Sequence, residues 1–194
     1  FSKLQLSFTN TVKLKGLLWG PFFMAKYLMK HLILLFAALS ISACSADEPK
    51  IKIKLKSNNP ALTASQYINY SESTHRTELK ELMAVDPKRM EWCAAFVNAV
   101  LDESGIQSNR THKYPFTARA FLDWGIPVTE PQPGDLVIFP RGNQGWQGHV
   151  GFYLSTISIN GVEYYHVLGG NQSNKVSIEM FRANKSLGIR RNLM

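Results

Sequence analysis

Two side chains in this sequence have the types that covalent catalysis by a thiol requires, a nucleophile and a base. The candidate nucleophile, Cys93, stands near the start of an apolar stretch, residues 91–104, whose spacing predicts a helix. A helix N-terminus carries partial positive charge, which favours thiolate over thiol, and its free N–H groups can stabilise an oxyanion. A single cysteine in an apolar helix is more often a small core residue. Cys93 alone therefore does not establish this chemistry.

The candidate base is His149, in the segment Gly148-His149-Val150-Gly151 at the mouth of a predicted strand that follows a Gly-rich loop. A histidine in that position can reach a helix N-terminus across a sheet. A Cys–His pair has to meet in space rather than in sequence, and such a pair hydrolyses amides through an acyl-enzyme. For His149 taken alone, a purely structural histidine is the alternative.

A third group should orient the imidazole. Asn171, in the segment 168–174, is the preferred candidate, because an amide carbonyl can accept the imidazole N–H. His166 and Gln172 are the alternates. The alternative for the whole segment is ordinary turn chemistry, in which Gly-Gly-Asn is common.

The elements that must position these residues form two groups along the chain. Helical patterns come first, and a meander of short apolar runs follows, with a hairpin signal at Asn160-Gly161. Helices followed by antiparallel strands predict an α+β fold, with the helices packed on one face of the sheet. The predicted helices are 61–70, 77–84, 91–104 and 116–124. The predicted strands are 135–139, 150–155, 163–168 and 176–180, with residues 157–162 forming the turn of the hairpin.

The N-terminal part of the sequence has the pattern of a targeting segment. From Met24, basic Lys26 and Lys30 precede a short apolar run, Leu32–Leu39, and small residues then lead to Cys44. This predicts a secretory signal over residues 24–43. The end of the segment resembles the bacterial lipobox, in which the cysteine is lipidated, so Cys44 is the predicted lipidation site.

A plain signal peptide cut near Ala43 is the alternative to lipidation. Ser45 stands where Asp usually signals inner-membrane retention, which favours the outer membrane and a domain facing the periplasm. We expect residues 1–23 to be upstream sequence foreign to the natural protein. Residues 44–60 would be the lipidated cysteine and a tether, and residues 61–194 the catalytic domain.

The distribution of charge argues against nucleic acid as a partner. The net charge is +8, but residues 1–43 contain five lysines and no acid, leaving 17 basic and 14 acidic residues in the rest. That surplus provides no basic surface of the kind that nucleic-acid binding requires. The two cysteines and their spacing also provide no Cys/His zinc site.

Five short segments occur in the order WCAAFVN (92–98), ARAFLDWG (118–125), PGDLVIF (133–139), GWQGHVGFY (145–153) and LGGNQSN (168–174). Together they resemble the NlpC-type and CHAP-type cysteine peptidase/amidase superfamily, and more narrowly its subgroup with WCAAF, GHVGFY and LGGNQ segments. The resemblance implies a papain-like fold and cleavage of amide bonds in peptidoglycan, with no metal or organic cofactor. By motif position, Cys93 matches the nucleophile, His149 the base and Asn171 a polar orienting residue. CHAP-type enzymes often have Glu two positions earlier, where this chain has Gly169.

The sequence therefore predicts a monomeric, lipid-anchored enzyme that hydrolyses an amide or peptide bond of the peptidoglycan stem peptide. Trp92, Trp124 and Trp146 flank the motifs and, with Gln172, are the predicted substrate-binding residues, although tryptophan is as often core or rim packing. Two other classes stay open. One is a papain-like acyltransferase or deamidase, and the other is a non-catalytic binding module of the envelope.

Overall fold

The computed structural model describes residues 58–192. The predicted signal peptide, the lipidation site Cys44 and most of the tether lie outside these residues. Within them, no helix is long and apolar enough to span a membrane.

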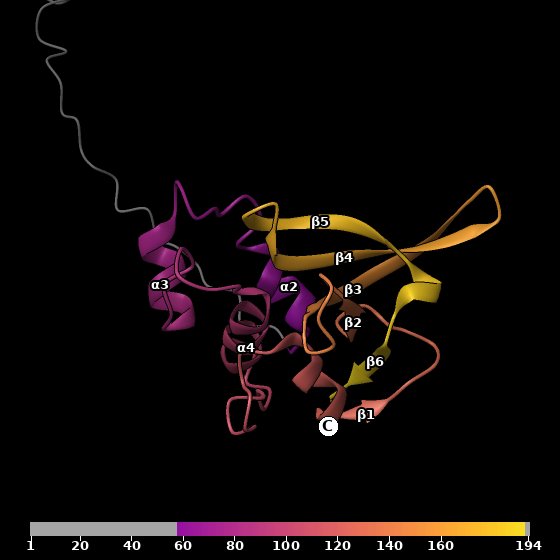
Figure 1. Ribbon diagram of the computed structural model, residues 1–194, viewed down its shortest axis with the longest axis horizontal. Helices are drawn as coiled ribbons and strands as arrows, with labels where there is room; N and C mark the ends of the chain where they lie inside the picture. The colour runs from indigo at the N-terminus through magenta and orange to yellow at the C-terminus, as the bar shows by residue number, and fades with distance from the viewer. Residues whose placement is uncertain (1–57, 193–194) are drawn as a thin grey trace, which may run out of the picture. The chain divides into compact units, whose positions relative to one another are not determined.

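The described chain forms one antiparallel sheet of six strands in the order β1-β6-β2-β3-β4-β5, with helices α2, α3 and α4 gathered together on one side of it (Figure 1). The predicted α+β class is confirmed. The helices are α2 (Pro60–Ser65), α3 (Arg76–Met83) and α4 (Cys93–Glu103), with short 3-10 helices η1 (Ala118–Asp123) and η2 (Ala183–Lys185). The strands are β1 (Ile126–Pro127), β2 (Leu136–Pro140), β3 (Gly148–Ile159), β4 (Val162–Gln172), β5 (Lys175–Arg182) and β6 (Gly188–Arg191).

Helix α4 is the centre of the core. Its residues from Cys93 to Leu101 are all buried, as expected for a helix that is apolar around its whole circumference. The core cluster joins this helix to Ile138, Val150 and Leu168 of the sheet. A smaller cluster, which includes Phe139, covers the other side of the sheet.

One buried polar residue of α4 fixes the segment that follows the helix. Asn98 donates from Nδ2 to the carbonyl of Pro115 at 2.7 Å, and its Oδ1 accepts from the N–H of Asn109 at 2.7 Å. Asn109 in turn donates to the carbonyl of Ala120 in η1 at 3.0 Å. Because these groups are buried, the bonds are costly to lose. They hold the residues before η1 in place beside the start of α4.

Strand β4 lies unusually close to the first turn of α4. A Cβ atom added at Gly170 would stand 2.6 Å from Cζ3 of Trp92 and 2.7 Å from Cβ of Phe96. Only glycine allows this approach. It brings the end of β4 beside the residue that begins α4, Cys93.

The structure differs from the sequence prediction mainly at the ends of elements. β3 runs unbroken to Ile159 and β4 runs to Gln172, so the predicted breaks near Thr156 and after Leu168 are absent. The first helix ends at Ser65 rather than at residue 70, and the chain turns at Asn69, which has a φ of 73°. Strands β1 and β6 were not predicted, because two and four residues are too few to show a period.

Candidate active site

Cys93 is the first residue of α4, with its side chain 3% exposed. Burial raises the pKa of the thiol, while hydrogen bonds from the backbone N–H groups of Val150 and Ala94 and the positive charge of Arg141 act in the opposite direction. Val150 directly follows His149, so the sulfur lies against the backbone next to the histidine. No hydrogen bond between the sulfur and the imidazole is formed.

His149 is the second residue of β3 and is 2% exposed. Its Nε2 lies 2.9 Å from Oε1 of Gln172, and its ring stacks on Phe181 with 5.3 Å between centroids. Its Nδ1 is buried and has no hydrogen-bond partner. One face of the ring therefore packs on an aromatic side chain, and one ring nitrogen is hydrogen-bonded while the other is not.

The contacts of Gln172 decide which imidazole nitrogen bears the proton. Its Nε2 donates to the carbonyls of Ser177 at 2.6 Å and Val167 at 3.3 Å, which turns Oε1 toward His149. A carbonyl oxygen only accepts, so Nε2 of His149 is the protonated nitrogen and Nδ1 is an unprotonated acceptor. This is the tautomer that a general base needs.

The electrostatics of the site favour an uncharged imidazole. Burial lowers the pKa of His149 from its ordinary 6.5 to about 4, the hydrogen bond with Gln172 acts in the opposite direction, and the charge of Arg141 lowers the pKa further. Near neutral pH the free protein therefore contains a neutral imidazole beside a neutral thiol.

The side chain that contacts His149 is that of Gln172, whereas the preferred sequence candidate was Asn171. The pairing of β4 with β5 shifts register between Gly169 and Gln172, and Asn171 has a left-handed φ of 58°. The bulge puts Gln172 on the face that Gly169 occupies, toward His149. Asn171 donates from Nδ2 to Oε2 of Glu91 at 2.5 Å, away from the imidazole.

The bulge also places Gln172 next to Gly169, the position at which CHAP-type enzymes often have Glu. A Cβ atom added at Gly169 would stand 3.2 Å from Nε2 of His149 and 2.9 Å from Oε1 of Gln172. The Gln172 amide therefore occupies the space that a longer residue 169 would enter. The other alternate, His166, contacts Ser155 instead, with 3.0 Å between Nδ1 and Oγ.

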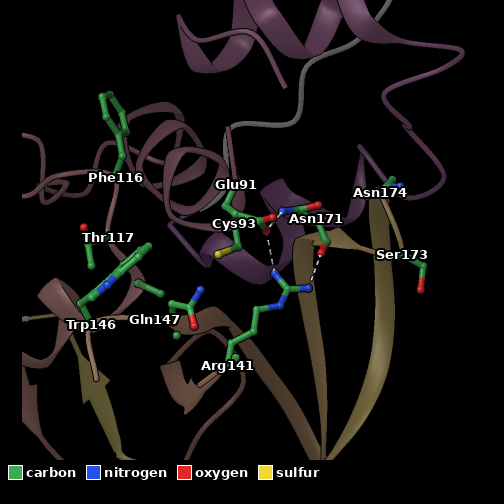
Figure 2. Close-up of a pocket in the computed structure, with 13 residues that line it drawn as sticks. Glu91, Cys93, Phe116, Thr117, Arg141, Trp146, Gln147, Asn171, Ser173 and Asn174 are labelled. Atoms are coloured by element: carbon green, nitrogen blue, oxygen red, sulfur yellow. Dashed lines mark hydrogen bonds and ion pairs between the residues drawn. The ribbon is translucent and has the colours of Figure 1, made fainter. Parts of the chain in front are cut away.

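An open cavity of about 530 Å³ lies over Cys93. Figure 2 shows Phe116, Thr117, Trp146 and Gln147 on one side of the thiol and Glu91, Arg141 and Asn171 on the other. We call these the aromatic wall and the charged wall. Gly148, Ala118, Gly142, Ser173 and Asn174 complete the lining.

Of the three predicted tryptophans, only Trp146 lines this groove, with 66% of its surface exposed. Trp92 is fully buried in the core and donates to Oε1 of Glu72 at 2.8 Å. Trp124 is 8% exposed, donates to the carbonyl of Gln107 and lies outside the groove. Gln172 is 1% exposed and does not line the groove either. Of the four predicted substrate-binding residues, the structure thus places Trp146 in the lining of the groove and Trp92, Trp124 and Gln172 outside it.

The loop between β2 and β3, residues 141–147, contributes Arg141 to the charged wall and Trp146 and Gln147 to the aromatic wall. Gln147 closes the loop on itself by accepting from the N–H of Gln144 at its Oε1, 3.0 Å away. Arg119 of η1 donates from Nε to the carbonyl of Gln147 at 2.7 Å. Arg141, at the other end of the loop, was missed by the sequence analysis because nothing in its local pattern distinguishes it from a surface arginine. The same holds for Glu91, which the sequence marked only as the start of a helix.

Within residues 58–192, no three His, Cys, Asp or Glu side chains are grouped so that they could hold a metal ion.

Fold and site thus define an α+β protein with a cysteine at a helix start and an amide-held histidine on the adjoining strand. Residues 85–171 match the model of the CHAP domain family, a segment that contains Cys93, Arg141, His149 and Asn171. This match supports the CHAP/NlpC-type superfamily. No curated protein and no solved structure matches the chain significantly.

The lowered pKa of His149 predicts a loss of stability in mild acid. The unfolded chain binds the His149 proton below about pH 6.5, whereas the folded protein binds it only near pH 4. The contribution of the neutral imidazole is therefore complete above pH 6.5 and is lost as the pH falls toward 4, by about 3 kcal/mol. Urea unfolding between pH 4 and 7.5 should show this loss, and His149→Asn should have a shallower dependence on pH. Equal dependence in the two proteins would contradict the burial argument.

Proposed function

We propose that this protein is a peptidoglycan hydrolase that cleaves an amide or peptide bond of the stem peptide with Cys93 as nucleophile and His149 as base. The observation that carries the proposal is the unpartnered, buried Nδ1 of His149, fixed as an acceptor by Gln172, in a residue whose chain neighbour Gly148 lines the same groove as Cys93. The CHAP domain match supports the choice of substrate, since CHAP domains are typically peptidoglycan hydrolases or amidases.

In the proposed reaction, the thiol proton of Cys93 passes to Nδ1 of His149 while the sulfur attacks the carbonyl carbon of the substrate. A C–S bond forms, and the carbonyl oxygen becomes an oxyanion that the backbone N–H of Cys93 can bind, because the first N–H groups of a helix have no partner within it. The C–N bond then breaks, and His149 returns the proton to the leaving amine. Water attacks the resulting thioester, again with His149 as base, and releases the acid and the free thiol.

The neutral resting pair fits this sequence of proton transfers. Desolvation disfavours both the thiolate of Cys93 and the imidazolium of His149. Proton transfer would therefore accompany attack on the carbonyl, when the negative charge moves onto the substrate oxygen. The sulfur and Nδ1 would close to hydrogen-bond distance in the substrate complex, as catalytic contacts often do.

Gln172 would act as the positioning residue for His149, in the role expected of Asn171. Its amide is held by two backbone carbonyls, so the Oε1 that accepts from His149 cannot easily rotate away. Trp146 on the aromatic wall is the residue best exposed to stack against a flat sugar or peptide unit.

We further propose that lipidation of Cys44 anchors the domain in the cell envelope, on the periplasmic side and preferably at the outer membrane. The support is the lipobox-like end of residues 24–43 and the absence of Asp after the cysteine. Acyl chains on one residue can give stable attachment, at about 0.8 kcal/mol per buried methylene. Tethering would raise the concentration of the domain near its substrate.

Digestion of purified peptidoglycan tests the reaction. The protein should release muropeptides whose new ends, identified by mass spectrometry, name the cleaved bond, and Cys93→Ala should release none. Circular dichroism would verify that the variant is folded. If the parent releases nothing from several wall types but transfers or deamidates an acyl donor, the chemistry belongs to the transferase class. An unreactive Cys93 in alkylation experiments would favour a binding module.

Replacing Gln172 tests its positioning role. Gln172→Ala should lower kcat/KM by about 10²-fold through misorientation of the imidazole. Gln172→Glu should retain the contact with His149 and shift the acid limb of the pH–rate profile to higher pH. Gly169→Glu added to Gln172→Ala should restore part of the rate, because the space beside Nε2 of His149 is then free for a carboxylate. A purely structural role for Gln172 predicts neither the shifted profile nor the rescue.

Membrane fractionation tests the anchor. The parent expressed in a bacterium should partition with membranes and into detergent, and Cys44→Ser should appear in the aqueous phase because it has no acyl acceptor. The same distribution for both proteins would argue for a plain cleaved signal.

A further inference from the structure

The charged wall of the groove has no part in the reaction just described. Arg141 directly follows β2, and Glu91 stands two residues before the nucleophile. Nη1 of Arg141 lies 3.3 Å from Oε2 of Glu91, and Nη2 donates to the carbonyl of Asn171 at 2.9 Å. All three residues line the cavity over Cys93.

The ion pair with Glu91 is too weak to explain the position of Arg141 by its contribution to stability. The Glu91 side chain is 80% exposed and that of Arg141 is 39% exposed, and an ion pair of this length between such groups contributes little. The backbone carbonyl of Asn171, by contrast, holds one side of the guanidinium in a fixed place. Since a guanidinium has five N–H donors, these two contacts leave donors free to meet a ligand.

The position of Arg141 relates it to the reacting groups. Arg141 lines the same cavity as Cys93, and its charge lowers the pKa of both Cys93 and His149. In Figure 2 the Arg141 side chain extends below Cys93 toward Glu91 and Asn171, with the aromatic wall on the opposite side. A group bound by Arg141 would thus lie on one side of the scissile bond, and a group stacked on Trp146 on the other.

We propose that Arg141 is the specificity residue of the groove and binds a free carboxylate of the substrate peptide next to the cleaved amide, displacing Glu91. This inference rests on the proposed function, in which the substrate is a stem peptide, an acidic peptide whose carboxylates lose their charge on amidation. Arginine suits the task because its planar fork pairs with a carboxylate through two parallel hydrogen bonds. Glu91, released from Arg141, remains at the rim.

Binding measurements test this subsite without turnover. The full chain bearing Cys93→Ala is titrated calorimetrically with two soluble stem peptides that differ only in whether their carboxylates are free or amidated. The free acid should bind about 10-fold more tightly or better, the size expected for hydrogen bonds to a charged group. Adding Arg141→Gln should abolish the difference, and Arg141→Lys should retain part of it. Adding Glu91→Gln should tighten binding of the free acid, because the competing carboxylate is gone.

Arg182→Gln is the matched control, because Arg182 is an exposed arginine of β5 outside the groove and its loss changes the charge equally. It should leave the preference intact. Equal affinity for the two peptides, no binding of either, or a preference that survives Arg141→Gln would overturn the assignment. Cleavage by the parent chain is assayed separately. A protein that prefers the free acid but cleaves nothing would contradict the proposed hydrolase activity and support the carboxylate subsite. Cleavage without a preference for the free acid would support the activity and contradict the subsite.

Discussion

The contact between the backbone of β4 and the first turn of α4 is the constraint on which the site depends. It requires a residue without a side chain at Gly170, because Trp92 and Phe96 occupy the space that a Cβ would take. Trp92 is itself fixed by its bond to Glu72. A buried tryptophan and a glycine thus set the distance between the helix that carries the thiol and the strand that carries Gln172. Since protein interiors are close-packed, a change at this contact would move both elements.

The bulge that follows this contact divides two tasks between neighbouring residues. Asn171 turns outward to Glu91 and offers its carbonyl to Arg141, while Gln172 turns inward to His149. In a regular strand, residues 169 and 171 would share a face. The bulge therefore lets two consecutive residues contact different groups: Asn171 contacts the rim of the groove, and Gln172 contacts the buried histidine.

Local patterns in the sequence were sufficient for the helix that begins at Cys93, the strand that holds His149 and the α+β order. Each depends on apolar periodicity or on a turn signal, which neighbouring residues determine. The contact of Gln172 with His149 was not predictable in this way, because it depends on a register shift against β5 and on the left-handed backbone of Asn171. Trp92 and Trp146 each stand one to three residues before a predicted catalytic residue, but the packing of α4 buries the first and the loop of residues 141–147 leaves the second exposed.

The loop of residues 141–147 has a consequence for how such a groove can diversify. Arg141 begins the loop and Trp146 lies near its end, and Gln147 and Arg119 brace it from within and from η1. One short segment thus contributes a residue to each wall of the groove, whereas Cys93, His149 and Gln172 belong to regular elements. Exchange of this one segment would replace Arg141 and Trp146 together and leave Cys93, His149 and Gln172 in place, so ligand preference can change independently of the catalytic residues.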